Sequence, residues 1–185
     1  MDAHDINDRR NSIGSSDVAA IIGASPEGWR NAADVYMEKR YGVDRSSKDT
    51  MATTVGNYME GGVTEWAEDQ LGPIDRQVRV SKSGYKVVNL DGRLRDDHKI
   101  GFECKTTGQS REWGDEWTDQ IPPYYSAQVL YQMHVADLET VYVPVLMWQY
   151  GFPTLKMYVI ERSECEEAIR AIAKAVRFFW HRHVL

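Results

Sequence analysis

Three residues suited to phosphodiester chemistry stand close together near the middle of the chain. Asp91 follows the short apolar run 86–90, and Glu103 and Lys105 form a Glu-x-Lys pattern in the next extended segment. Two neighbouring carboxylates repel each other unless a cation joins them, and Mg²⁺ prefers carboxylate, water and phosphate oxygens. A lysine beside them can hold an attacking water or help to deprotonate it. The pattern therefore indicates a site that cuts phosphodiester bonds.

The flanking segments predict how these side chains come together. Strands are expected at 86–90 and 99–105, joined by a polar turn at 93–98. Because alternate side chains of a strand share a face, Glu103 and Lys105 point the same way, and Asp91 at the exit of the first strand can lie next to Glu103. The same spacing also fits an exposed hairpin with a Glu/Lys pair on one face, because such patterns arise by chance.

Composition limits the class of protein. A chain of 185 residues is expected to form a single domain over 1–185. The two cysteines, Cys104 and Cys165, have no metal-binding or disulfide-framework spacing, which favours a reducing cytosol. The net charge of −6 argues against a non-specific nucleic-acid coat protein. No signal peptide or membrane span is expected, because no apolar run approaches about 18 residues.

The N-terminal segment contains a second set of residues with possible phosphate chemistry. Ser15, Ser16 and Asp17 precede the Ala/Ile-rich run 18–23, which predicts the start of a helix there. Backbone amides at a helix N-terminus bind phosphate, and Arg9 lies a short reach upstream. Ordinary helix capping beside a solvated arginine explains the same residues.

The remaining pattern predicts helices alternating with strands. Further helices are expected at 31–41, 53–71, 124–136 and 163–183, and further strands at 77–81, 141–149 and 154–160. This order indicates an α/β fold with a central mixed β-sheet flanked by helices. Glycines are unfavourable within a helix, so those of 53–71 predict close packing by another backbone; they are Gly56, Gly61 and Gly62.

The polar segment 106–120 carries an arginine and two tryptophans. It fits a substrate-facing flap, with Arg111 on a phosphate and a tryptophan stacked on a base. It fits equally a surface loop whose tryptophans, Trp113 and Trp117, dock on the core.

Five blocks of the sequence, taken together over residues 8–136, resemble the phage λ exonuclease and YqaJ-type viral recombinase family of the PD-(D/E)xK nuclease superfamily. They stand in the family's order and spacing. Asn89 and Leu90 replace the Ser/Thr-Pro that commonly precedes the first aspartate. The blocks are Arg9 with 13–23, 56–60, Asp91-Gly92, Glu103-Cys104-Lys105, and 125–129.

The resemblance implies a metal site. Asp91 and Glu103 are its implied ligands, with the Cys104 carbonyl as a third. Glu60 would complete the acidic cluster directly, through water or through a second Mg²⁺, although the glycine pair that follows it makes its placing less secure. Mg²⁺ is the implied cofactor, and Mn²⁺ is expected to substitute for it.

Further positions receive roles by the same resemblance. Lys105 is the implied catalytic lysine, and Gln128 would orient the water or the scissile phosphate. Arg9 and Ser16 match the pocket that holds a 5′-phosphate, and Arg111 is assigned to it as well.

The implied protein is an Mg²⁺-dependent deoxyribonuclease with a PD-(D/E)xK restriction-endonuclease-like core. Its expected activity is 5′-to-3′ exonuclease digestion of linear double-stranded DNA ends for phage-type recombination. The implied setting is the cytoplasm of a bacterial host, as a homo-oligomer such as a ring-shaped trimer, with a single-strand annealing protein as partner and no membrane. The alternatives are an endonuclease of the same superfamily and a weakly catalytic DNA-binding or assembly protein on this fold.

Overall fold

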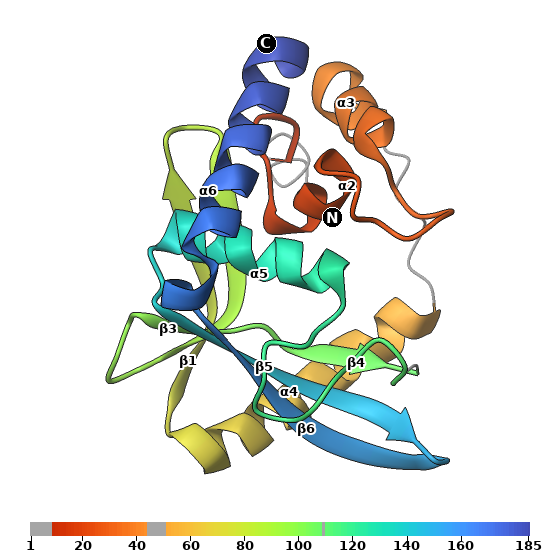
Figure 1. Ribbon diagram of the computed structural model, residues 1–185, viewed down its shortest axis with the longest axis vertical. Helices are drawn as coiled ribbons and strands as arrows, with labels where there is room; N and C mark the ends of the chain where they lie inside the picture. Colours follow the sequence, from red (N-terminus) through yellow and green to blue (C-terminus); the bar gives the residue numbers. More distant parts are fainter. Residues whose placement is uncertain (1–8, 44–50, 109) are drawn as a thin grey trace.

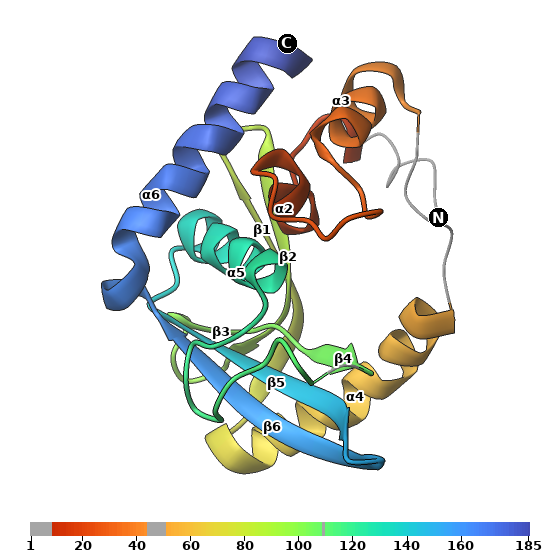
Figure 2. The same cartoon turned by 45° about the vertical axis from the view of Figure 1, so that its right-hand side comes forward.

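A single twisted sheet separates two sets of helices (Figures 1 and 2). The computed structural model describes residues 9–43, 51–108 and 110–185. Helices α5 (Pro123–Ala136) and α6 (Arg162–Phe179) lie together on one side, and α4 (Met51–Leu71) lies on the other. The short N-terminal helices pack against the α5 and α6 side. The predicted α/β fold with a mixed sheet flanked by helices is therefore confirmed.

The elements follow the predicted order. The N-terminal helices are the 3₁₀ turn η1 (Ser15–Asp17), α2 (Val18–Ile21) and α3 (Ala32–Tyr41), and the π-helical turn η2 (Trp180–Val184) follows α6. The strands are β1 (Ile74–Lys82), β2 (Lys86–Leu94), β3 (Ile100–Phe102), β4 (Lys105–Thr107), β5 (Thr140–Gln149) and β6 (Phe152–Glu161). The predicted linker 42–50 lies mostly outside the described residues.

The sheet combines antiparallel hairpins with a parallel centre. β1 pairs antiparallel with β2, and β2 pairs antiparallel with β3. β3 and β4 both pair in parallel with one side of β5, and β6 pairs antiparallel with its other side. The parallel pairing needs a crossover, which α5 supplies between β4 and β5.

The predicted strand 99–105 is interrupted at Glu103 and Cys104. The register with β5 continues across the break, since Phe102 pairs with Tyr142 and Lys105 pairs with Val145. The backbone N–H of Glu103 donates to the Tyr142 carbonyl, 3.1 Å away. The next hydrogen bond of a parallel ladder would run from the N–H of residue 144 to the Glu103 carbonyl. Residue 144 is proline, which has no N–H. Pro144 therefore explains the break.

Two other details of the sequence interpretation were wrong. Asp91 does not stand at the exit of its strand, because β2 continues to Leu94, whose partner at the far end of β1 is Ile74. The helix glycines do not mark close packing, because a Cβ added to Gly56, Gly61 or Gly62 would meet nothing within 4 Å. The buried side of α4 is confined to Val63, Thr64 and Ala67, and Tyr58 is 80% exposed.

The main hydrophobic core lies between the sheet and helices α2, α5 and α6. Its largest fully buried side chains include Tyr131, Tyr158 and Leu90. A smaller cluster on the other side, centred on Phe102 and Met157, packs under Ala67 of α4. None of the helices in the described ranges is both long and apolar enough to span a membrane.

Alanine substitutions of two glycines test which of them is closely packed. A Cβ on Gly92 of β2 would overlap the Ile74 side chain, so Gly92→Ala is expected to lower the free energy of unfolding by about 1–3 kcal/mol. Gly61→Ala is expected to raise it by up to about 1 kcal/mol, because alanine is the better helix former. Urea unfolding of both variants checks this. A destabilised Gly61→Ala protein would contradict the open environment described for α4.

Candidate active site

A buried carboxylate lies at the point where the parallel strand is interrupted. Glu103 is 3% exposed, and both of its oxygens accept hydrogen bonds. Oε1 accepts from Lys105 Nζ and, at 2.5 Å, from Gln128 Nε2. Oε2 accepts from Gln132 Nε2 at 2.6 Å. Helix α5 therefore supplies two amide donors, one turn apart, to a carboxylate carried by the sheet.

Lys105 occupies the centre of this group. Its ammonium contacts Glu103, lies 3.3 Å from Gln128 Oε1 and lies 4.9 Å from the centre of the Tyr125 ring. Burial lowers the pKa of Lys105, but the Glu103 and Asp91 carboxylates outweigh it, so the pKa is raised above its ordinary value. The lysine is therefore held as a cation that can donate to a phosphate oxygen or to water.

Asp91 is the second acidic member. Its Oδ2 accepts from the backbone N–H of Cys104 at 2.8 Å, which ties β2 to the interrupted strand. Burial, followed by repulsion from Glu103, raises the pKa of Asp91 to about 8; Glu60 adds to this, and Lys105 opposes it. The structure therefore brings Asp91, Glu103, Lys105 and Gln128 together as the sequence predicted.

Glu60 is near this group but is not hydrogen-bonded to it. Its charge helps to raise the pKa of Asp91, and it contributes also at Cys104, where burial is the main cause of a pKa raised to about 12. Cys104 therefore stays a thiol, and its Sγ lies 3.4 Å from Thr64 Oγ1 of α4. In residues 9–43, 51–108 and 110–185, no three acidic, histidine or cysteine side chains form a metal-holding group.

The donor set nevertheless fits a hard divalent cation. Mg²⁺ is commonly held by one or two carboxylates together with water and substrate phosphate. Asp91 and Glu103 provide two. Burial is the main cause of the raised pKa of Asp91, and the next is the repulsion between the two carboxylates. A cation between them would relieve it.

Gln132 was not predicted as a site residue. It is fully buried, donates to Glu103, and has a side-chain oxygen without a hydrogen-bond partner within the described parts of the chain. A buried amide is costly unless it is satisfied, so its position against a buried carboxylate points to a supporting role. The signal in the sequence was the spacing of Gln128 and Gln132, one turn apart on an otherwise apolar helix.

The N-terminal residues form a separate group. Ser16 is exposed in η1, while the neighbouring Asp17 is 2% exposed and pairs with Arg30 at 2.5 Å and Lys39 at 2.8 Å. The Arg9 side chain is 43% exposed and lies 3.6 Å from Glu38. No hydrogen bond or ion pair links Arg9 or Ser16 to the site at Glu103, so their role in a phosphate pocket stays a prediction.

The helix-dipole argument for that pocket is weakened. The predicted helix 18–23 is the four-residue α2, preceded by a single 3₁₀ turn, and it ends before Gly23, whose φ is +74°. A helix this short has a small macrodipole. A phosphate there would depend on the Arg9 and Ser16 side chains and on local amides.

Each of the two interpretations of the loop after β4 describes a part of it. Trp113 is 8% exposed and packs on Tyr125 and Tyr158, so it docks on the core. Trp117 is 51% exposed, and Arg111 is exposed and forms no hydrogen bond or ion pair within the described part of the chain. Arg111 as a phosphate ligand stays a prediction.

The α/β fold is shared with phage-related exonucleases of known structure. A phage-related exonuclease from Haemophilus somnus 129PT superposes with a TM-score of 0.66 at 13% identity, covering 91% of this chain and 93% of its own. The alkaline exonuclease LHK-Exo from Laribacter hongkongensis superposes with a TM-score of 0.64 at 15% identity, covering 95% and 93%. At these identities the likeness is one of fold.

The family follows from the sequence itself. Residues 6–139 match the YqaJ-like viral recombinase domain, and the chain belongs to that family. No curated protein sequence matches it significantly. The matched range contains every predicted site residue.

The raised pKa of Asp91 predicts a pH-dependent stability. The carboxyl loses its proton near pH 3.8 when unfolded but near pH 8 when folded, so the folded state loses stability as pH rises from 3.8 to about 8. In metal-free buffer, Asp91→Asn is therefore expected to become more stable relative to the wild type across this range. Urea unfolding at several pH values measures the difference. A pH-independent difference between Asp91→Asn and the wild type would contradict the prediction.

Proposed function

We propose that the protein is an Mg²⁺-dependent deoxyribonuclease that digests linear double-stranded DNA from its 5′ ends. The observation that supports this most directly is the convergence of Asp91, Glu103, Lys105 and Gln128 at the interrupted strand. Membership of the YqaJ-like viral recombinase family and the fold shared with phage-type exonucleases support the same class. LHK-Exo also has a structure in complex with dAMP, a nucleoside monophosphate of the kind that an exonuclease releases.

Asp91 and Glu103 would hold the metal, with the Cys104 carbonyl and Glu60 as further oxygen donors. Bound Mg²⁺ supplies a water of lowered pKa and offsets charge on the phosphate and the leaving oxygen. Mn²⁺, which also favours oxygen donors, is expected to replace it.

The protein side chains provide positioning and charge. Lys105, held as a cation beside Glu103, would donate to the attacking water or to a non-bridging phosphate oxygen. Gln128 and Gln132 fix the Glu103 carboxylate from two sides, so its oxygens need no reorganisation during the reaction. Gln128 is also close enough to Lys105 to orient its ammonium.

Capture of a 5′-phosphate would make the enzyme specific for ends. Arg9 is partly exposed and only loosely paired with Glu38, and Ser16 is exposed nearby in sequence, so both are accessible to a phosphate. Arg111 would add a third contact. Such an exonuclease would act in phage-type recombination in the cytoplasm of a bacterial host. A homo-oligomer and a single-strand annealing partner complete the proposal.

Removal of the lysine tests the chemistry. Lys105→Ala is expected to lower the rate of DNA hydrolysis by at least about 10²-fold, because a charged donor at the reacting group is lost. Glu103→Ala should have the same effect, with circular dichroism showing a retained fold. Lys99→Ala removes an exposed lysine paired with Asp137 and serves as the control. Near-normal hydrolysis by folded Lys105→Ala protein would overturn the site assignment.

The choice of end tests the phosphate pocket. Arg9→Ala is expected to reduce the preference for 5′-phosphorylated over 5′-hydroxyl duplex ends, because the main charged contact is removed. The two rates are compared on otherwise identical linear DNA, with Arg95→Ala, an exposed arginine of another region, as the control. An unchanged ratio for Arg9→Ala would show that the pocket lies elsewhere.

The substrate form separates the proposal from its alternatives. Purified protein with Mg²⁺ is incubated with linear 5′-phosphorylated duplex and, separately, with closed circular plasmid. Loss of the linear DNA alone supports an exonuclease. Loss of both would establish an endonuclease, and loss of neither would favour a DNA-binding or assembly role.

A further inference from the structure

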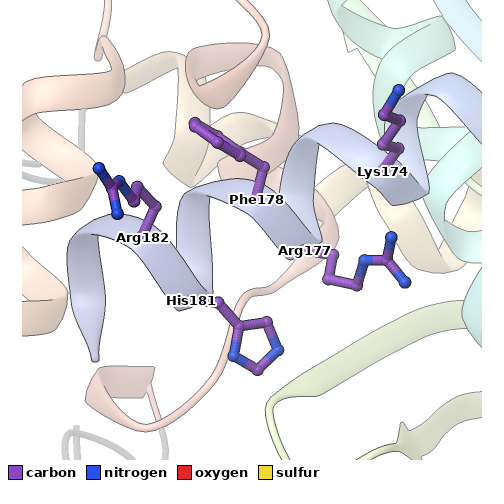
Figure 3. Close-up of a pocket in the computed structure, with 5 residues that line it drawn as sticks. All are labelled: Lys174, Arg177, Phe178, His181 and Arg182. Carbon is purple, nitrogen blue, oxygen red and sulfur yellow. The ribbon is translucent and has the colours of Figure 1, made fainter.

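The C-terminal half of the last helix carries a basic surface that the proposed site does not use. From residue 168 onward the chain has no acidic side chain, although Glu164, Glu166 and Glu167 crowd the start of α6. Five exposed residues line a shallow depression on the outer side of the helix (Figure 3), and we call them the basic face: Lys174, Arg177, Phe178, His181 and Arg182. In a protein of net charge −6, this is a local concentration of positive charge.

Among the residues that the structure describes, the cations of the basic face have no acidic partners. Arg162 and Arg170, nearer the helix start, both pair with Glu166. Lys174, Arg177 and Arg182 form no ion pair with any residue that the structure describes. Cations at a helix C-terminus stabilise its dipole, but that effect fades beyond the last turn, and Lys174 lies more than a turn from the end of α6.

Phe178 is the feature that neither the dipole nor the core explains. It is 62% exposed, whereas its neighbours Phe179 and Trp180 are each 7% exposed and pack in the core. Figure 3 shows Lys174, Phe178 and Arg182 on one side of the helix. Residues four apart on a helix are about 6 Å apart along its axis, so this aromatic ring stands midway between two cations.

The β1–β2 hairpin extends the positive charge beside the basic face. The Tyr85 ring stacks on Trp180 with centres 5.0 Å apart and meets His181 edge-on at 5.6 Å, which fixes the hairpin against α6. The hairpin carries Lys82 and Lys86, and Lys86 Nζ lies 3.0 Å from His134 Nε2 of α5. Burial, then the charges of Lys82 and Arg177, lower the pKa of Lys86.

We propose that the basic face binds single-stranded DNA, with phosphates on Lys174, Arg177 and Arg182 and a base stacked on Phe178. Grooves for single strands combine cations that follow the backbone with aromatic rings that accept unstacked bases. A duplex offers phosphates but keeps its bases stacked within the helix, so it would offer no base to the Phe178 ring, which meets His183 edge-on at 5.8 Å but is 62% exposed. The choice of DNA as the ligand rests on the proposed function.

The location suits a strand that has passed the active site. Lys86 begins β2 and Asp91 lies five residues along it. At 3.4 Å per residue, the hairpin beside the basic face is therefore about 17 Å from Asp91. Digestion of one strand of a duplex leaves the other strand as single-stranded DNA. The basic face would hold that strand.

Binding of circular single-stranded DNA tests the inference without a DNA end and without cleavage. The full-length protein is titrated in EDTA against circular single-stranded DNA, with closed circular duplex as the comparison. Phe178→Ala is expected to weaken single-strand binding about 5- to 150-fold and to leave duplex binding unchanged, while Phe178→Trp retains the affinity. Lys174→Ala with Arg182→Ala should reduce the slope of log affinity against log salt by about 1.4.

Arg170→Ala is the matched control, because it removes an arginine of the same helix that is paired with Glu166; it should bind like the wild type. Unchanged single-strand affinity of Phe178→Ala, or an equal loss for duplex, overturns the inference. A changed molecular mass of Phe178→Ala in light scattering also overturns it, since the face would then be a subunit interface.

Failure of the exonuclease proposal gives a different result. A wild type that does not digest linear duplex in Mg²⁺ removes the proposed function, while the circular-strand titration still decides the role of Phe178.

Discussion

The structure of the site depends on satisfying the hydrogen bonds of one carboxyl group inside the protein. Glu103 is nearly inaccessible, and an isolated buried carboxylate would be strongly destabilising. Lys105 supplies the opposite charge, and Gln128 and Gln132 supply hydrogen bonds to both oxygens. The position of α5 against the sheet, and therefore the shape of the main core, must match this requirement. Residues of the candidate site are here the same residues that make the burial tolerable.

The residues of the candidate site could be predicted because their types are unusual where they occur. Asp91, Glu103 and Lys105 interrupt apolar, strand-forming segments, and Gln128 interrupts an apolar helix. Alternation along strands then places them on common faces, which is a local property of the chain. The order of helices and strands was predictable for the same reason, since hydrophobic periodicity is local. These parts of the fold and site agree with the structure.

The parts that could not be predicted depend on contacts between distant segments. The break at Glu103 and Cys104 is set by Pro144 on another strand, and it becomes visible only when the register with β5 is known. The burial of Asp17 requires Arg30 and Lys39 to fold back over η1. The continuation of β2 beyond Asp91 depends on its pairing with β1. Each is a tertiary constraint that overrides the local pattern.

The N-terminal segment shows how a local signal can have two meanings. Ser15, Ser16 and Asp17 resemble a helix cap, and Asp17 does accept a hydrogen bond from the amide of Gly14. The same carboxylate also anchors Arg30 and Lys39, so it is an electrostatic support for the segment that carries Arg9. Its burial with two cations fixes η1 on the rest of the domain, while Ser16 next to it stays open to solvent.

The parallel pairing of the interrupted strand with β5 has a consequence for biosynthesis. The hydrogen bond from Glu103 to Tyr142 closes a segment that contains the whole of α5, so it is a non-local contact that forms late. A ribosome-bound chain that ends before residue 142 has Asp91, Glu103 and Lys105 but no strand to hold them in register. The group of residues around Glu103 is therefore assembled only when synthesis has passed β5.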